Sequence, residues 1–303
     1  MAQPPAAKVS SPRGLRGDYS RAAPDYCVAQ DWEHYSAQEH ALWSTLYRRQ
    51  LALVERYAAH EFLEGTHLLG ASAEQIPRFE EINVRLAAAS GWRIVAVPGL
   101  IPDQQFFDHL AERRFPVTVW IRRPEELDYL VEPDVFHDFF GHVPLLTNPV
   151  FARFMQAYGR AGAKAMQVPG GLTMLSRLYW YMVEFGLILD RSGLRVYGAG
   201  ILSSKGETVY SVESPEPQRL RFELVRVMRT DYRIDSYQQS YFVLDSYEEL
   251  FDACYGTDFT PLYERFGTAA PLAADARLPG DRIVPPRAPQ SALADGGQTA
   301  PPA

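Results

Sequence analysis

The sequence contains little cysteine: Cys27 and Cys254 are the two thiols in 303 residues. Two thiols so far apart exclude a disulfide scaffold and a cysteine-rich zinc site, and they are typical of a reducing compartment. No stretch approaches the ~18 uninterrupted apolar residues that a membrane helix needs. The first residues also lack the apolar core of a signal peptide. We therefore expect a cytoplasmic protein with no membrane partner.

Motifs of several common enzyme classes are absent as well. No G-x-G-x-x-G sequence follows a predicted strand, and neither a P-loop nor a G-x-S-x-G elbow occurs. These absences argue against dinucleotide binding, phosphate-loop chemistry and the α/β-hydrolase mechanism. The formal net charge is -7 without a long acidic run, so we expect no general affinity for nucleic acid.

The composition is that of one core with polar ends. Hydrophobic residues make up 47% of the chain and aromatic residues 13%, which is enough for a sizeable core. Residues 1–25 are rich in Ala, Pro, Ser and Arg, and residues 267–303 repeat Pro, Ala and Gly. We expect a flexible leader, a catalytic domain at residues 26–266 and a disordered tail. Because the tail has no apolar heptad, we expect a monomer.

The apolar periodicity between these ends is mostly helical. It predicts helices at residues 39–58, 72–90 with a break near Pro77, 102–114, 134–142, 149–166, 172–190 and 215–228, and a last helix after residue 246. Segments rich in Val and Ile predict short strands at residues 92–99, 115–123 and 241–246. The predicted fold class is α+β, a predominantly helical single domain with small β elements.

Glu184 lies in an otherwise apolar segment. Residues 178–189 (LYWYMVEFGLIL) contain no other charge, which predicts a helix buried on most of its circumference. A buried carboxylate is costly unless it is paired or binds a metal. A salt bridge with Arg177 is one interpretation of Glu184, and a metal ligand is the other.

Two histidines lie near a predicted helix end in the segment EPDVFHDFFGHVPLL. Asp134 after Pro133 is a good helix start, and Gly141 is a good stop. His137 and His142 are five residues apart, roughly 140° around an ideal helix, so they would not share a face. We expect them to converge only if the helix ends between them.

Two imidazoles and one carboxylate, with no cysteine nearby, form the ligand set of non-haem Fe(II) oxygenases. The same set can hold catalytic zinc in hydrolases, although the H-E-x-x-H motif of zinc peptidases is absent. Asp138, next to a histidine, is the expected partner that orients a ligand. The residues alone predict a metal site, with iron favoured over zinc.

Two further features each allow two interpretations. Arg122 and Arg123 end the predicted strand at residues 115–123, either as a solvated pair or as a fork that clamps a carboxylate. Residues 197–204 (YGAGILSS) form a small-residue loop. This loop is either a tight packing turn or a wall where a substrate approaches the backbone.

Three motifs in this order, PDVFHDFFGHVPLL, LYWYMVEFGL and YGAGILSSKGE, resemble those of the pterin-dependent aromatic amino acid hydroxylases. The resemblance covers roughly residues 30–260, and three long motifs in the correct order make an accidental match very rare. The chain has no room for the regulatory domain or the tetramerisation helix of animal members, so it is similar to the short bacterial form.

The resemblance implies roles for individual residues. It implies that His137, His142 and Glu184 bind Fe(II), with no catalytic residue beyond these ligands. The substrate would contact Arg122, Ser203, Trp180, Pro133 and Phe185, with Ser203 also supporting His137. The reduced pterin would contact Phe106, Leu100, Ile101, Asp138 and Tyr179. Animal members have Thr-Pro where this chain has Leu130 and Val131. A hydroxyl contact to the substrate is therefore missing, and Arg122 and Ser203 would do more.

The implied reaction converts L-phenylalanine to L-tyrosine with O2 and tetrahydrobiopterin or a related reduced pterin, as the first step of phenylalanine catabolism. The short single-domain form favours phenylalanine, and tryptophan and tyrosine are the alternative substrates within the family. A zinc hydrolase with the same three ligands is the alternative from another class. A catalytically inactive binding protein is a third alternative, but its motifs should be damaged, and here they are intact.

Overall fold

The computed structural model describes residues 15–128 and 130–288. Its α-helices are α1 (Ala37–Tyr57), α2 (His60–Leu69), α3 (Phe79–Ser90), α4 (Asp103–Ala111), α5 (Pro149–Ala165), α6 (Gly171–Tyr179), α7 (Ala199–Leu202), α8 (Lys205–Glu213), α9 (Leu224–Arg229), α10 (Tyr247–Cys254) and α11 (Thr260–Phe266). Its strands are β1 (Arg93–Val97), β2 (Arg114–Thr118), β3 (Leu187–Asp190), β4 (Gly193–Val196), β5 (Gln218–Arg221) and β6 (Ser240–Leu244).

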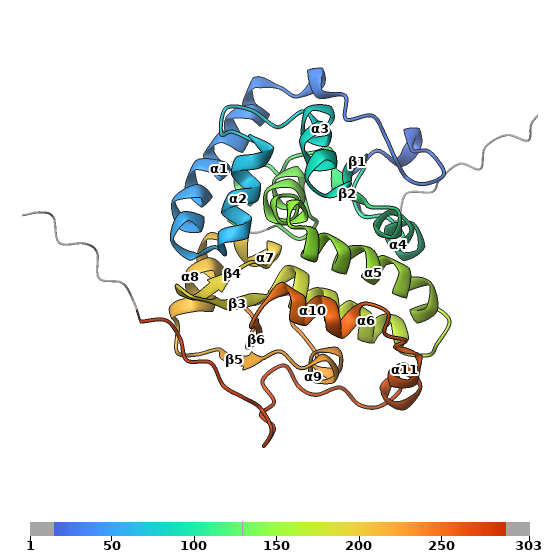
Figure 1. The fold of residues 1–303 in the computed structure, drawn as a ribbon. Helices are drawn as coiled ribbons and strands as arrows, with labels where there is room; N and C mark the ends of the chain where they lie inside the picture. The colour runs from blue at the N-terminus through green and yellow to red at the C-terminus, as the bar shows by residue number, and fades with distance from the viewer. Residues whose placement is uncertain (1–14, 129, 289–303) are drawn as a thin grey trace, which may run out of the picture.

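Shorter helical segments complete the chain. They are the 3₁₀ turns η1 (Tyr19–Arg21), η2 (Trp32–His34), η3 (Pro124–Glu126) and η5 (Pro144–Thr147), and the π-helical segments η4 (His137–His142) and η6 (Trp180–Glu184). Figure 1 shows α5 crossing the middle of the molecule, with α1–α4 on one side and the four-stranded sheet on the other. One continuous cluster of buried apolar side chains joins the two sides, so the described residues form a single domain.

Local sequence signals explain where the long helices begin. Ser36 caps α1 and exchanges hydrogen bonds with Glu39, which forms a capping box. Asn148 caps α5, and Pro149 occupies the first helical position, where its missing N–H costs nothing. The apolar face of α1 buries Trp43 in the core.

The strands form two small sheets. β1 and β2 pair in parallel, from Arg93 opposite Arg114 to Val97 opposite Thr118, and α4 is the crossover between them. The second sheet has the order β4-β3-β6-β5, with β3 antiparallel to β4 and the other two pairs parallel. The predicted α+β fold with mainly helices and small β elements is confirmed.

Three predicted helices are wrong in part. The helix expected at residues 72–90 begins only at Phe79, and residues 72–78 before it are not helical. The helix expected at residues 172–190 ends at Glu184, and its last residues form β3, which pairs with β4 and β6. The helix expected at residues 215–228 begins only at Leu224, because Gln218–Arg221 form strand β5 against β6. Both strands β3 and β5 pair with β6, which is distant in sequence, and such pairing overrides local propensity.

The expected ends also differ from the structure within the described residues. Tyr19 is 2% exposed and its hydroxyl donates to the Leu100 carbonyl, so the expected flexible leader is anchored to the domain at this residue. Leu272 exchanges backbone hydrogen bonds with Arg229 and Asp231, and Val284 donates to Arg219. The expectation of disorder is therefore wrong for this part of the tail, whereas residues 1–14 and 289–303 lie outside the described residues. Among the described helices, none is long and apolar enough to cross a membrane.

Candidate metal centre

His137 and His142 are brought together by a π-helical turn. Both lie in η4, whose hydrogen bonds run from residue i to i+5 rather than to i+4. The wider turn places residues five apart one above the other, and the two imidazole centroids are 5.2 Å apart. The expectation that the helix must end between the histidines is wrong, because the wider π-helical turn brings the two imidazoles together within one helical segment.

Glu184 ends a second π-helical segment, η6. The N–H of Phe185 closes this segment by donating to the carbonyl of Trp180 at 2.9 Å. The Glu184 carboxylate lies 3.1 Å from His142 Nε2 and 3.6 Å from His137 Nε2. Arg177 instead contacts Asp231 at 3.5 Å. The interpretation of Glu184 as the partner of Arg177 is therefore wrong, and the carboxylate faces the two imidazoles.

Ser203 determines which nitrogen of His137 carries the proton. The Ser203 hydroxyl donates to the carbonyl of Ala199 at 2.9 Å, so its oxygen accepts from His137 Nδ1, also at 2.9 Å. The lone pair of His137 is then on Nε2, the nitrogen that faces Glu184. Burial lowers the pKa of His137 to about 4, so this imidazole is neutral at neutral pH.

The electrostatics of the three groups suit a divalent cation. Burial by itself would raise the pKa of Glu184, but the nearby imidazoles of His142 and His137 lower it below the usual value. An ionised carboxylate and the lone pair of a neutral imidazole thus point at the same small space. Two histidines and one carboxylate in this arrangement match the ligand preference of non-haem Fe(II).

Asp138 lies beside this centre and is anchored to β2. Its Oδ2 accepts from the backbone N–H of Thr118 at 2.8 Å. His137, Asp138 and His142 each offer one potential ligand atom, and these three atoms lie within 4.8 Å of one another. Burial raises the pKa of Asp138 to about 7. The structure therefore places Asp138 beside the two histidines. The sequence analysis expected it there as a residue that orients a metal ligand, not as a ligand itself.

The loop at residues 197–204 is a packing turn built around α7. A Cβ at Gly198 would lie 2.5 Å from the carbonyl oxygen of Glu184, and one at Gly200 would lie 3.1 Å from it. A Cβ at Gly141 would meet the Ala199 carbonyl at 2.9 Å. Small residues therefore let α7 approach η4 and η6 closely, which carries Ser203 to His137.

Arg122 is buried beside the centre, and its fork is already paired. Its Nε and Nη2 donate to the two carboxylate oxygens of Asp134 at 2.8 and 2.9 Å. Its Nη1 lies 3.4 Å from the Leu127 carbonyl, which is a weak contact. The interpretation of Arg122 as a solvated residue is wrong, and Nη1 is the nitrogen left for a further acceptor.

Aromatic side chains form a wall next to Glu184. The Trp180 indole stacks on Tyr232 with centroids 4.3 Å apart and planes at 14°, and Phe185 lies 4.7 Å away. Trp180 Nε1 donates to Gln238 Oε1 at 3.0 Å. Nothing in the sequence singled out Tyr232 or Gln238, because both lie outside the motifs and reach Trp180 only through the fold.

A second line of rings runs from α4 to the metal centre. Phe106 meets Tyr179 edge to face at 5.6 Å, and Tyr179 lies 6.2 Å from the ring of His142. Leu100 and Ile101 lie in the connection between β1 and α4, and Leu100 is 48% exposed. Phe106 and Tyr179, two of the five predicted pterin contacts, thus lie along one line of rings leading to the centre, and Asp138 lies beside its end.

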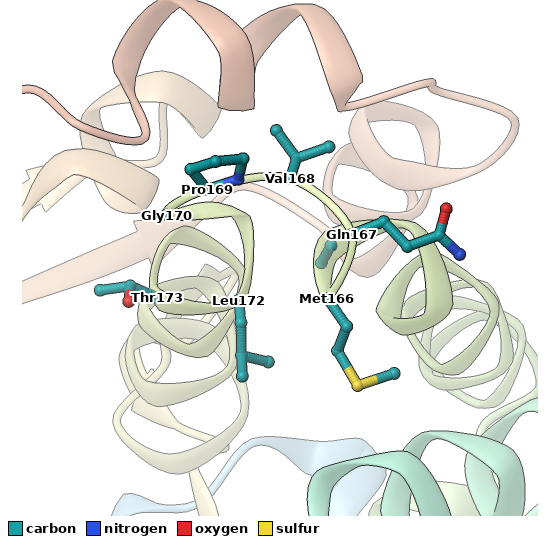
Figure 2. Close-up of a pocket in the computed structure, with 8 residues that line it drawn as sticks. Met166, Gln167, Val168, Pro169, Gly170, Leu172 and Thr173 are labelled. Atoms are coloured by element: carbon teal, nitrogen blue, oxygen red, sulfur yellow. The ribbon is translucent and has the colours of Figure 1, made fainter.

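Two cavities lie elsewhere in the described part of the molecule. One, of about 390 Å³, is formed by the turn between α5 and α6, where Met166, Leu172 and Pro169 contribute to its walls (Figure 2). The other, of about 420 Å³, lies between η2, α3 and β1. Neither cavity is lined by a residue of the metal centre, and the first has no titratable side chain.

A second group of potential ligands is less suited to a metal. Asp25, Cys27 and His109 place one ligand atom each within 4.8 Å of one another. However, Arg114 already pairs with Asp25 at 3.0 Å, and His109 Nε2 lies 2.8 Å from the Asp25 carbonyl. Burial raises the pKa of Cys27 to about 11, so the thiol is protonated at neutral pH.

Comparisons with known proteins agree with this geometry. A family model described as biopterin-dependent aromatic amino acid hydroxylase matches residues 5–256. The phenylalanine-4-hydroxylase of Ralstonia nicotianae is 56% identical over 271 residues, which cover 89% of this chain and 85% of the relative.

Solved structures give the same result. Phenylalanine hydroxylase from Chromobacterium violaceum with bound iron(III) and the oxidised cofactor 7,8-dihydrobiopterin has a TM-score of 0.83 at 54% identity, covering 89% of this chain and 96% of that chain. Its structure with bound iron and phenylalanine has a TM-score of 0.82 at 52% identity, covering 89% and 97%. The chain belongs to the biopterin-dependent aromatic amino acid hydroxylase family.

Proposed function

We propose that this protein is a phenylalanine 4-monooxygenase, which hydroxylates L-phenylalanine to L-tyrosine with O2 and tetrahydrobiopterin or a related reduced pterin. The observation that carries the proposal is the convergence of His137, His142 and Glu184, in which the carboxylate lies 3.1 Å from His142 Nε2 and 3.6 Å from His137 Nε2. These three side chains would hold Fe(II). When bound, the iron and the reduced pterin supply dioxygen activation and electrons.

The substrate side of the centre is proposed from the residues around Glu184. Arg122 Nη1 would receive the amino acid carboxylate, with Ser203 close by, because a charged hydrogen bond of this kind is strong. Trp180 and Phe185, together with Pro133 at the helix start, would enclose the aromatic ring. Stacking on Tyr232 and the hydrogen bond to Gln238 hold the Trp180 indole in place, so the pocket is preorganised.

The pterin side is proposed from the second line of rings. Phe106 would stack on the bicyclic ring, with the loop at Leu100 and Ile101 lying along one edge. Tyr179 and Asp138 would contact the pterin on the side nearest the iron. This proposal is supported by the path of Phe106, Tyr179 and His142, which leads from α4 to the metal centre.

The assembly and the location of the protein are proposed from its sequence. We propose a monomer, because the chain has no apolar heptad near its end. We propose a cytoplasmic location, because the two cysteines do not form a disulfide and both are free thiols. Light scattering of the purified protein tests the first proposal, and a tetramer would overturn it.

A product assay tests the proposed function directly. Purified protein is supplied with Fe(II), reduced pterin and O2, and phenylalanine, tryptophan and tyrosine are offered in parallel. We expect tyrosine from phenylalanine as the main product. Activity with 2-oxoglutarate in place of pterin would overturn the proposal, as would full activity of a zinc-loaded protein without reductant.

Metal analysis of variants tests the ligand set separately. Replacing His142 with Ala removes one of three protein ligands, so we expect the loss of bound iron and of activity. His67→Ala is the matched control, because His67 is an exposed histidine on α2. A His142→Ala protein that keeps stoichiometric, active iron would show that the ligands are misassigned.

A further inference from the structure

The N-terminal segment before the first long helix lies against the loop that follows β1. Tyr19 is 2% exposed, and its hydroxyl donates to the backbone carbonyl of Leu100 at 2.8 Å. Tyr19 itself is held by η1, whose first turn is capped by Asp18. The buried Tyr19 side chain thus holds the carbonyl of Leu100, which lies 81 residues away in sequence.

The backbone of this segment is also in direct contact with that loop. A Cβ at Gly17 would lie 1.7 Å from the carbonyl oxygen of Pro98, so only glycine permits the approach. The same carbonyl accepts from Trp120 Nε1 at 3.1 Å. Gly99 has a φ of +152°, and a Cβ there would lie 2.9 Å from the Tyr19 hydroxyl. The packing leaves little space between the two segments.

Arg16 fixes the same segment to Glu126 and Glu132, which follow Arg122, the proposed substrate arginine, in the sequence. Its Nη1 donates to Glu126 at 2.8 Å, and its backbone N–H donates to Glu132 Oε2 at 3.1 Å. Its guanidinium lies 4.7 Å from the ring centroid of Trp120. Residues 16–19 therefore contact the connection between β1 and α4 and also the side chains of Glu126 and Glu132.

The loop fixed by Tyr19 carries Leu100 and Ile101, the residues assigned to the pterin edge under the proposed function. A connecting loop loses conformational entropy when it binds a ligand, and fixing it beforehand reduces that loss. We propose that residues 16–19 form a strap across this loop and that Tyr19 is a positioning residue for pterin. The inference rests on the proposed pterin site.

The test compares two substitutions that remove the same chemical group. Tyr19→Phe deletes the hydroxyl that holds the Leu100 carbonyl. Tyr47→Phe is the matched control, because the Tyr47 hydroxyl also donates to a backbone carbonyl, that of Ala71 at 2.9 Å, and Tyr47 is 4% exposed. Binding of 7,8-dihydrobiopterin to the iron-loaded protein is measured by titration calorimetry, together with phenylalanine binding and the thermal midpoint.

We expect Tyr19→Phe to weaken dihydrobiopterin binding about three- to tenfold, the range of one lost hydrogen bond, with phenylalanine affinity and iron content unchanged. Tyr47→Phe should lower the thermal midpoint by a similar amount but leave pterin affinity as in the parent. Gly17→Ala, which pushes the strap off Pro98, should weaken pterin binding at least as much as Tyr19→Phe.

Phe106→Ala separates a failure of the strap from a failure of the proposed function. If Phe106→Ala weakens pterin binding but Tyr19→Phe does not, the strap has no positioning role and the inference is overturned. If neither variant changes pterin binding, the pterin site itself is misplaced. Equal losses of pterin and phenylalanine affinity in Tyr19→Phe would show a general structural effect and would also overturn the inference.

Discussion

Arg122 and Asp134 form a buried, bidentate ion pair at 2.8 and 2.9 Å, with 6% and 0% of their side chains exposed. Asp134 also accepts from the backbone N–H groups of Arg122 and His137 at 2.9 and 3.0 Å. The Asp134 carboxylate therefore holds both Arg122, the proposed substrate arginine, and His137, the first residue of η4. Asp134 therefore joins the proposed substrate side of the centre to the candidate metal side.

Arg122→Lys tests the substrate role of this pair. Lysine keeps the charge near Asp134 but cannot form the fork, so one charged hydrogen bond to a substrate carboxylate is lost. We expect the Kd for phenylalanine to rise about ten- to a hundredfold, which corresponds to roughly 1.5–3 kcal/mol, while iron content stays the same. Arg123→Lys is the control, because Arg123 is exposed. An unchanged Kd in Arg122→Lys would contradict the role.

Ser203→Ala tests how the orientation of His137 affects the metal. Without the hydroxyl oxygen, His137 Nδ1 loses its acceptor at 2.9 Å and the imidazole is free to change its tautomer. Removing a partner of a metal ligand lowers metal affinity by about 10- to 100-fold. Competition with a chelator measures this change. Ser204→Ala, which removes the cap of α8, should leave iron affinity nearly unchanged; equal losses in both variants would argue against the role of Ser203.

Asp281→Ala tests whether the packed part of the tail contributes to stability. Asp281 pairs with Arg226 at 3.0 and 3.3 Å, and the two side chains are 8% and 5% exposed. Removing one partner leaves a buried, uncompensated charge, so we expect a loss of about 3–5 kcal/mol in the free energy of unfolding. Urea denaturation measures it, with Asp275→Ala at an exposed site as the control. Equal midpoints for the two variants would restore the original expectation of a free tail.

Glu207→Gln tests a pH effect on stability. Burial raises the pKa of Glu207 from 4.5 to about 7, although its Oε1 accepts from Gln238 N and the Tyr241 hydroxyl. Between these pKa values the folded state binds more protons than the unfolded state. The contribution of Glu207 is therefore fully present below pH 4.5 and is lost as the pH rises to 7.

We expect the Glu207→Gln protein to lose less stability than the parent between pH 5 and pH 8, because glutamine stays neutral and keeps an oxygen acceptor. Urea midpoints of both proteins at the two pH values give the difference. Glu216→Gln, at an exposed position, should follow the parent. A parallel fall in parent and Glu207→Gln midpoints would place the titration on another group.

Helix starts and the chemical types at the centre could be predicted from local sequence. Helices α1, α4, α5 and α6 begin within two residues of the positions that the local pattern predicted, and the apolar segment around Glu184 is largely buried as expected, whereas α3 and α9 begin later than predicted. Strands β3 and β5 could not be predicted, because both pair with β6, whose residues lie far from theirs along the chain.

The sequence by itself determined the candidate donor set, because imidazole and carboxylate are fixed by the residues His137, His142 and Glu184. It did not determine their geometry. An ideal helix keeps residues five apart on different faces, and only the π-helical turn, packed against α7 at Gly141, aligns the two histidines. The tautomer of His137 depends on Ser203, 66 residues away. Such contacts form only when distant segments pack together, so only the tertiary structure decided them.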